Sequence, residues 1–276
     1  MKKQPFGLTT WLPFFIIHLM RYLLRFLILS LLSLLCSEHT YSTVGLPGSP
    51  PLVHSELILL ELFTSQGCSS CPPADQLLAK LQAEAAAGKL PVVALSYHVD
   101  YWNRLGWTDP YSDKAFSARQ RTYARKLPDH SVYTPQLIVH GRSGHVGSRE
   151  GEVRNAIAAA RGKGRHTHIQ LRKHATERGH ILLAYQLDGA ISNFVLNVAV
   201  VEASVSNDVP KGENRGRHLQ HVQVVRDFQQ ISTPAPTGLL RINPGVLKQR
   251  ANGQVVVFVQ DADSWAVRGV AVWEDW

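Results

Sequence analysis

The chain has 276 residues, of which 45% are hydrophobic and 18% are charged. This composition supplies enough apolar side chains for a folded core and excludes a disordered chain. The formal net charge is +8, and it falls to +5 without residues 1–42, which carry four basic side chains and one acidic one. The remaining positive charges are scattered, with no run of five or more like charges, so nucleic acid is not an expected partner.

The first forty residues have the pattern of an export signal. An almost wholly apolar stretch at 27–35 follows Arg21 and Arg25. It is too short to span a bilayer comfortably, but it fits the apolar region of a signal peptide behind a basic start. Residues 1–42 are therefore predicted to be a signal peptide or an N-terminal anchor. The protein is expected to be periplasmic or secreted, and to contact a membrane only through this segment if it is not cleaved.

Alternating strand and helix patterns follow a proline- and glycine-rich linker at 43–55. Residues 57–63 form a nearly continuous apolar run, which is typical of a strand buried on both faces. Apolar residues recur at helical spacing over 74–85, before Gly88, and 92–97 is a second buried strand. A strand, a helix and a strand in this order predict a parallel pair of strands with a right-handed crossover.

A helical insertion is predicted at 99–129, inside a domain that extends over residues 56–162. The insertion is rich in Trp, Tyr and Arg, and its helix is expected to begin at Ser112 or Asp113. Its aromatic side chains either line a groove beside the cysteines or cover the sheet in place of a helix. The later elements expected in this domain are a strand at 136–139, a short strand at 145–146 and a helix at 150–160.

Short strands replace helices beyond Gly162–Gly164, which is the predicted domain boundary. Several segments alternate or are β-branched, and turns such as Asp188-Gly189 separate them. Such a series is typical of a β-rich, sandwich-like antiparallel module, here over 165–276. Lys211–Arg217 has the glycines of a phosphate loop without the following helix, so it is predicted to be a hairpin connection. The strands are expected at 168–173, 180–187, 194–201, 219–226, 239–242, 255–260 and 266–273.

Two of the three cysteines, Cys68 and Cys71, stand between the first strand and the helix. A disulfide across two residues restrains little chain entropy, so this spacing favours chemistry over stapling. Backbone N–H groups and the positive end of the helix dipole favour a thiolate there. Cys68 is predicted to be the exposed nucleophile and Cys71 to attack the mixed disulfide. An inert structural disulfide and half of a metal site are the alternatives.

Two further positions fit this chemistry. Thr134 and Pro135 stand directly before the strand at 136–139, where thioredoxin-like folds have a cis-proline whose preceding residue offers its backbone to a bound peptide. We therefore expect a cis bond between them. Glu61 interrupts the apolar run of the first strand, and a buried carboxylate there could take the proton from Cys71. A position at a solvated edge is the alternative for Glu61.

The chain resembles a bacterial secreted family known as domain of unknown function 1223 (DUF1223), from about Glu56 to the C-terminus. The resemblance implies a thioredoxin-like fold followed by a β-rich part, and it brings no established substrate. Gly67 replaces the Trp that precedes the first cysteine in ordinary thioredoxins, and Ser-Ser fills the dipeptide, which leaves open whether the protein is an oxidase or a reductase. The matching segments are Glu61–Asp75, Leu95–Trp102, Tyr133–Gln136 and Gly212–Arg217.

The leading hypothesis from the sequence is an exported thiol–disulfide oxidoreductase that uses Cys68 and Cys71 on protein thiols or disulfides, with no cofactor. A rival is a copper chaperone, in which His98 joins the two thiolates in a donor set that suits Cu(I). His98 as a hydrogen-bonded structural residue is the alternative to that metal role. In a third hypothesis the protein is a non-catalytic adaptor. The residues leave the substrate protein, the direction of electron flow and the oligomeric state open.

Overall fold

The computed structural model describes residues 57–163, 167–189 and 192–276. Residues 53–276 form one compact unit. The predicted signal peptide or anchor and the linker at 43–55 lie outside the described residues, as does Gly164 of the predicted boundary. No helix in the described ranges is long and apolar enough to cross a membrane.

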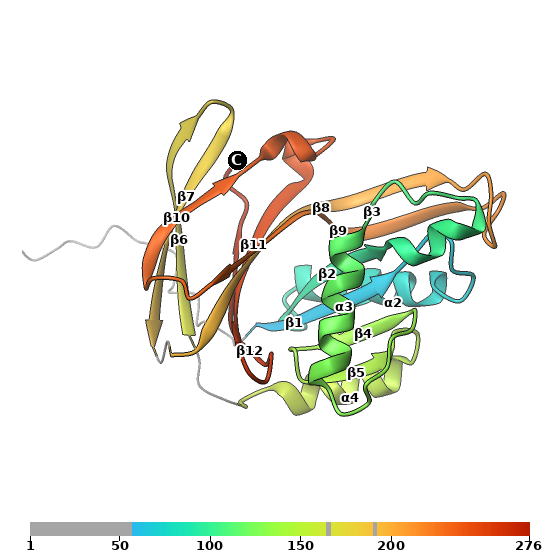
Figure 1. The fold of residues 1–276 in the computed structure, drawn as a ribbon, viewed down its shortest axis with the longest axis horizontal. Coiled ribbons are helices and arrows are strands. Elements are labelled where there is room, and N and C mark those ends of the chain that lie inside the picture. Colours follow the sequence, from blue (N-terminus) through green and yellow to red (C-terminus); the bar gives the residue numbers. More distant parts are fainter. Residues whose placement is uncertain (1–56, 164–166, 190–191) are drawn as a thin grey trace, which may run out of the picture. The chain divides into compact units, whose positions relative to one another are not determined.

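The described residues form a mixed α/β structure built on a sheet of nine strands (Figure 1). Strand β1 (Ile58–Thr64) pairs in parallel with β2 (Val92–Val99), and helix α2 (Pro72–Ala86) connects them. The parallel pair predicted from the apolar runs is therefore confirmed. Strand β4 (Gln136–Val139) pairs antiparallel with β1, and β5 (Ser143–Val146) pairs antiparallel with β4.

The segment after β2 contains one α-helix, as expected for the insertion. A 3-10 helix, η1 (Asp100–Leu105), comes first, and the two-residue strand β3 (Ser112–Asp113) precedes α3 (Lys114–Lys126). The Asp113 side chain accepts a hydrogen bond from the Ala115 backbone N at 2.7 Å, which caps the first turn of α3. Asp113 is thus the residue that begins this helix, one of the two expected. The last helix of this half is α4 (Glu150–Ala160).

The two faces of β1 pack against different helices. Ile58, Leu60 and Leu62 are fully buried in a cluster with apolar side chains of α2 and α4. Leu59 and Phe63 point the other way and join a cluster with side chains of α3 and of later strands. Because successive side chains of a strand alternate between faces, a continuous apolar run is what this doubly covered position requires.

All seven segments that were expected to be strands in the C-terminal part are strands. The structure adds that β8 and β9 continue the sheet of the first part, because β9 pairs with β2 through Ser96 and Val224. Figure 1 shows these two long strands running from β11 past β2 and α3. The strands are β6 (Thr167–Glu177), β7 (His180–Gly189), β8 (Phe194–Asp208), β9 (His218–Ser232), β10 (Thr237–Ile242), β11 (Gly253–Asp261) and β12 (Val267–Trp273), with 3-10 helices η2 (Pro244–Val246) and η3 (Arg250–Asn252) between β10 and β11.

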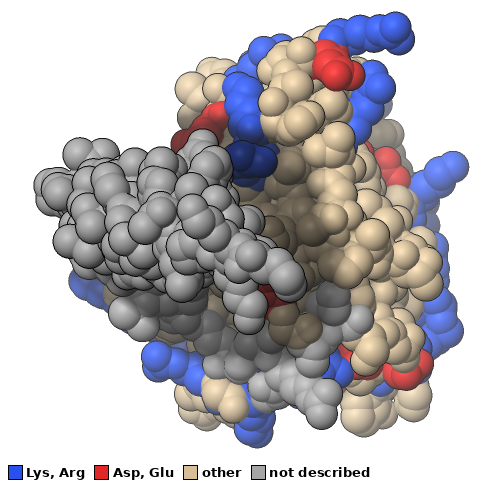
Figure 2. Space-filling view, turned by 90° about the vertical axis from the view of Figure 1, so that its left-hand side faces the viewer, with Lys and Arg blue, Asp and Glu red and all other residues tan. Residues whose placement is uncertain are grey.

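A second sheet of three strands, in the order β10-β7-β6, packs on the large one. Apolar side chains of β6, β7 and β10 share one buried cluster with those of β8, β11 and β12. The division of the chain into two domains at Gly162–Gly164 stays a prediction, although one sheet passes through both halves. Figure 2 shows Lys and Arg side chains spread over the face that is drawn, with acidic side chains among them.

Candidate functional site around Cys68 and Cys71

The two cysteines form a disulfide at the junction of β1 and α2, with their Cα atoms 5.4 Å apart. Cys71 is the N-cap residue of α2, and its side chain makes no capping hydrogen bond. Pro72 and Pro73 occupy the first two helical positions and have no N–H group. The free backbone N–H donors that were expected beside the Cys68 sulfur are therefore largely missing.

Side-chain hydroxyls take the place of those donors. The Thr134 Oγ1 atom lies 3.3 Å from the Cys68 sulfur, and the Ser70 Oγ atom lies at the same distance. The Trp102 indole N–H, which can only donate, is bonded to Thr134 Oγ1 at 2.8 Å. Thr134 therefore accepts from Trp102 and directs its own hydrogen at the sulfur. The Thr134–Pro135 peptide bond is cis, which confirms the expected geometry.

The expectation that Cys68 is exposed is wrong. Both cysteines are 0% exposed, whereas Ser69 and Ser70 between them are exposed. The loop between β8 and β9 covers this turn: Asn214 Nδ2 donates to the carbonyl oxygens of Gln66 and Cys68, each at 2.9 Å. Part of this cover therefore comes from a residue that lies 146 positions away from Cys68 in the chain.

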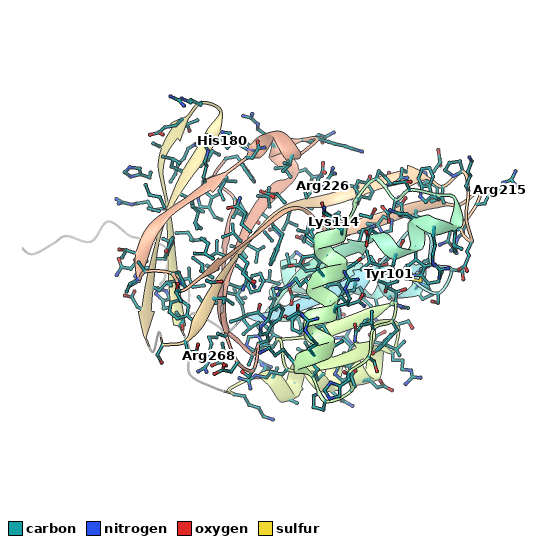
Figure 3. All side chains as sticks on the ribbon, viewed as in Figure 1. Tyr101, Lys114, His180, Arg215, Arg226 and Arg268 are labelled. Carbon is teal, nitrogen blue, oxygen red and sulfur yellow. A yellow bond between two sulfur atoms is a disulfide. The ribbon has the colours of Figure 1, made fainter. Side chains whose placement is uncertain are left out.

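The covering loop joins two antiparallel strands, as predicted for Lys211–Arg217. The Ser69 backbone N donates to Glu213 Oε2 at 3.0 Å, so a carboxylate contacts the backbone between the two cysteines. Hydrogen bonds from the Ser69 side chain and then from its backbone lower the pKa of Glu213. Figure 3 labels Arg215 in the covering loop and Tyr101 in η1, at the same end of the view.

Gly67 has a packing role that the sequence comparison with thioredoxins left open. A Cβ atom at this position would lie 3.0 Å from the Cβ of Trp102 and 3.4 Å from its carbonyl oxygen. The absence of a side chain at Gly67 thus allows Trp102 to approach the turn and reach Thr134. Both roles expected for the aromatic segment are present. Trp102 lies beside the cysteine turn, and Tyr101 and Trp102 both pack against the core, where Tyr101 donates to Gln120 of α3.

Gln66 anchors the turn to the C-terminal strands. Its Oε1 accepts from Trp107 Nε1 and from Asn207 Nδ2, both at 3.1 Å, and its Nε2 donates to Asn207 Oδ1 at 2.6 Å. The same Nε2 lies 3.2 Å from His221 Nε2 in β9. The side chain is fully buried, so each of these partners replaces a hydrogen bond that water would otherwise make.

His98 is held in a buried polar cluster and does not join the cysteines. Its Nδ1 lies 2.7 Å from Asp109 Oδ2, and the same oxygen accepts from the Gln66 backbone N at 2.8 Å. The His98 ring packs edge to face on the ring of His221, with centroids 4.6 Å apart. In the described part of the chain, no three His, Cys, Asp or Glu side chains form a group that could hold a metal ion. The arrangement required by the copper hypothesis is not formed, and His98 has the hydrogen-bonded position of the alternative.

Glu61 is buried, but it lies away from the cysteine turn. It shares the face of Leu59 and Phe63, which is covered by α3, whereas Cys71 begins the helix on the opposite face. Arg119 of α3 binds both carboxylate oxygens, at 2.9 and 3.0 Å, and the Tyr123 hydroxyl donates to one of them. The structure therefore brings together Cys68, Cys71, Thr134 and Pro135 but not Glu61.

The sequence matches the family described as protein of unknown function (DUF1223) over residues 59–260. The chain belongs to this family. The resemblance based on the cysteine, Tyr-Thr-Pro and Gly212–Arg217 segments is thereby confirmed. No curated protein matches the chain.

Two solved structures are similar to this DUF1223 chain. Protein AGR_C_4864 from Agrobacterium tumefaciens is 29% identical, with a TM-score of 0.59 over 78% of this chain and 92% of that one. HBP35 of Porphyromonas gingivalis is 13% identical, with a TM-score of 0.55 over 80% of this chain and 75% of that one. At 13% identity the second likeness shows the fold alone.

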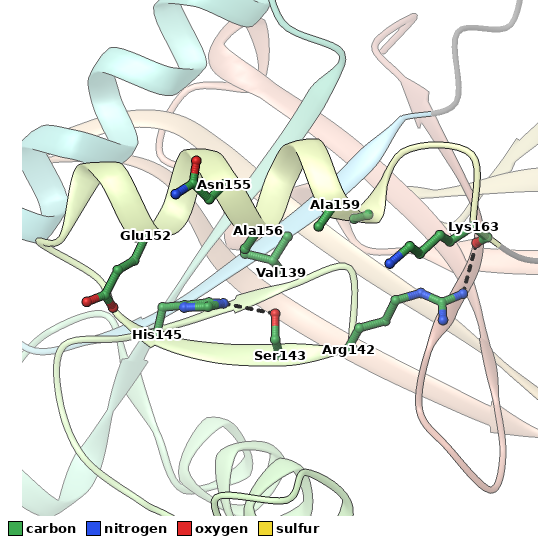
Figure 4. A pocket seen from close by; sticks show the side chains of 10 residues that line it. Val139, Arg142, Ser143, His145, Glu152, Asn155, Ala156, Ala159 and Lys163 are labelled. Carbon is green, nitrogen blue, oxygen red and sulfur yellow. Dashed lines mark hydrogen bonds between the residues drawn. The ribbon is translucent and has the colours of Figure 1, made fainter.

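A pocket beside β4 is lined by residues other than the two cysteines (Figure 4). It lies between β5 and α4, and its polar lining includes Arg142, His145 and Glu152. His145 Nε2 lies 2.9 Å from Ser143 Oγ. None of the residues predicted for the cysteine site lines this pocket.

Sequence reasoning missed the polar residues that surround the cysteine turn in this DUF1223 protein. Asn214 and Glu213 lie in the Gly212–Arg217 segment, which was predicted to be a hairpin connection. The same segment also carried the family resemblance, and this indicated a role beyond connecting two strands. His221 is a buried polar residue within a strand, and such residues need partners. The other missed residues of the cluster are Gln66, Asp75, Asp109 and Asn207.

Proposed function

We propose that this DUF1223 protein is an exported thiol–disulfide oxidoreductase and that residues 56–162 form a thioredoxin-type domain. One observation carries the proposal: the Thr134 hydroxyl, beside a cis-proline, lies 3.3 Å from the Cys68 sulfur at a strand–helix junction. A hydroxyl that donates to sulfur stabilises the thiolate more than the neutral thiol. The parallel β1-α2-β2 unit with β4 antiparallel to β1 is consistent with the thioredoxin-type order.

In the proposed reaction the reduced protein acts on a disulfide of another protein. The Cys68 thiolate attacks one partner sulfur, a mixed disulfide forms, and the other partner sulfur leaves as a thiolate. Cys71 then loses its proton and attacks the Cys68 sulfur. The Cys68–Cys71 disulfide forms and the second partner thiolate leaves, so two electrons pass to the partner. Run in reverse, the same steps oxidise a partner dithiol.

Export is proposed from the N-terminal pattern of residues 1–42 and from the chemistry of the pair. Disulfides persist in the periplasm and outside the cell, whereas the cytosol keeps thiols reduced. The proposed partners are therefore exported proteins that carry thiols or disulfides. N-terminal sequencing of the protein recovered from the periplasmic fraction of an expressing bacterium tests this part.

The activity is tested by insulin reduction and by recovery of activity from scrambled ribonuclease. Wild type and Cys68→Ser are compared in both assays, with Cys36→Ser as the matched control because Cys36 lies outside the proposed site. We expect activity in wild type and Cys36→Ser and its loss in Cys68→Ser. Thr134→Val keeps the shape of the side chain without the hydroxyl, so it should raise the pKa of the Cys68 thiol. Equal and negligible activity in wild type and Cys68→Ser would overturn the proposal and favour the adaptor hypothesis.

A further inference from the structure

A buried pair of titratable side chains lies under the first turn of α2. Asp75 follows Cys71 by one helical turn, and its backbone N donates to the Cys71 carbonyl oxygen at 3.1 Å. Cys71 itself has helical backbone angles, so residues four apart place their side chains on the same face of the helix. Asp75 is 7% exposed, and its Oδ2 lies 3.5 Å from Nδ1 of His221, which is 2% exposed.

The hydrogen bonds of Gln66 assign the proton of the His221 ring. Trp107 Nε1 can only donate, so the Gln66 atom that it contacts is the amide oxygen. The amide nitrogen of Gln66 then faces His221 Nε2, which must accept. The neutral ring consequently carries its proton on Nδ1, the ring nitrogen that lies 3.5 Å from Asp75 Oδ2.

We propose that Asp75 is the proton acceptor for Cys71 and that His221 is the residue that positions it. This inference rests on the proposed thiol–disulfide exchange and replaces Glu61 in it. When Cys71 attacks the Cys68 sulfur of the mixed disulfide, the thiol proton passes to the Asp75 carboxylate and the partner leaves as a thiolate. In the reverse direction, Asp75 returns that proton to Cys71 as the Cys68–Cys71 bond breaks.

The groups around the pair support this assignment. Four side chains surround the His221 ring. Asp75 comes from α2, His98 from β2, and Tyr111 and Asp109 from the segment between η1 and β3. Burial opposes a charged imidazole, but the carboxylates of Asp75 and Asp109 outweigh it and raise the pKa of His221. His221 therefore binds an additional proton more readily than an isolated buried imidazole would. Glu61 has no such freedom, because Arg119 binds both of its oxygens.

The experiment follows the attack of Cys71 directly. The full-length chain with Cys36→Ser is reduced and mixed with 5,5′-dithiobis(2-nitrobenzoate) in a stopped-flow instrument. The first thionitrobenzoate reports the mixed disulfide on Cys68, and the second reports its displacement by Cys71. The rate of the second release is measured from pH 6 to 9.5 in this background and with Asp75→Asn or His221→Gln. Asp208→Asn and His218→Gln, an exposed Asp–His pair at 2.7 Å, are the matched controls.

With an acceptor present, the rate of the second release depends weakly on pH below 8. In Asp75→Asn we expect it to fall about 10- to 100-fold at pH 7 and to rise about tenfold per pH unit, as for a thiol of pKa about 8.5 that ionises unaided. The profiles should converge near pH 9.5, and the controls should match the unsubstituted background. The inference is overturned if Asp75→Asn keeps the pH profile of the background. It is also overturned, whether or not the variants fold, if the background itself rises tenfold per unit below pH 8. Absence of any second release would instead contradict the proposed function.

Discussion

The loop that covers the disulfide should control how fast the disulfide is reduced. Asn214→Ala removes two hydrogen bonds, to the carbonyl oxygens of Gln66 and Cys68, both buried and both 2.9 Å long. A hydrogen bond of this kind contributes about 0.5–1.5 kcal/mol, so the closed loop should lose about 1–3 kcal/mol relative to an open one. If reduction requires opening, the rate should rise about 5- to 150-fold, since 1.4 kcal/mol is a factor of ten.

The rate is measured with dithiothreitol at low concentration, by alkylation of the released thiols and mass spectrometry. Asn252→Ala is the matched control, because that side chain makes one exposed hydrogen bond, to the Ser204 carbonyl oxygen. The control should be reduced at the wild-type rate. The reasoning is refuted if Asn214→Ala is reduced no faster than the control while both proteins unfold at similar urea concentrations.

Three further predictions concern charged groups. Glu213→Gln removes the negative charge that contacts the backbone between the cysteines, so it should lower the pKa of the Cys68 thiol. The pH dependence of alkylation measures this pKa, and an unchanged or higher value contradicts the prediction. Arg119→Met should cost about 3–5 kcal/mol of unfolding free energy because the Glu61 side chain stays buried without its ionic partner, and adding Glu61→Gln should recover most of it in urea titrations. The Ser264 backbone N–H and nearby groups lower the pKa of Asp261 to about 2. Its stabilisation exists above pH 4 and is lost as the pH falls through 2, so Asp261→Asn should cost about 1–2 kcal/mol at pH 7 and almost nothing at about pH 1.

The elements of the fold could be predicted because each leaves a local pattern. The run at 57–63 has no polar face except at Glu61, which indicated a strand covered on both sides. The helix at 150–160 and the strand at 136–139 have the predicted bounds, since a proline and charged residues mark their starts. The cis bond between Thr134 and Pro135 could be predicted from the position of these residues directly before a strand.

The pairing of β9 with β2 could not be predicted in the same way. An alternating pattern says which side chains share a face, but it does not name the neighbouring strand. The two strands meet through a single pair of residues, Ser96 and Val224, and Gln223 beside it has a positive φ of 55°. A bulge-like irregularity of this kind leaves no periodic signal in the sequence.

The position of Glu61 shows that the alternation of side chains along a strand decides which groups a residue can reach. The carboxylate was expected near Cys71 because it interrupts the apolar run of the first strand, where thioredoxins have a buried carboxylate. It follows Leu59 and precedes Phe63 at intervals of two, so it must share their face, which α3 covers. Asp75, in contrast, lies on the helix that Cys71 begins, and helical spacing alone places the two together.

The burial of Cys68 has a consequence for the way the two halves of the chain depend on each other. Without β8, β9 and their loop, the Gln66 side chain would lose Asn207 and His221, and two carbonyl oxygens of the cysteine turn would lose Asn214. The C-terminal strands therefore do more than extend the sheet. They supply the hydrogen bonds that hold the cysteine turn closed and the imidazole that faces Asp75, so the chemistry of the first half depends on residues of the second.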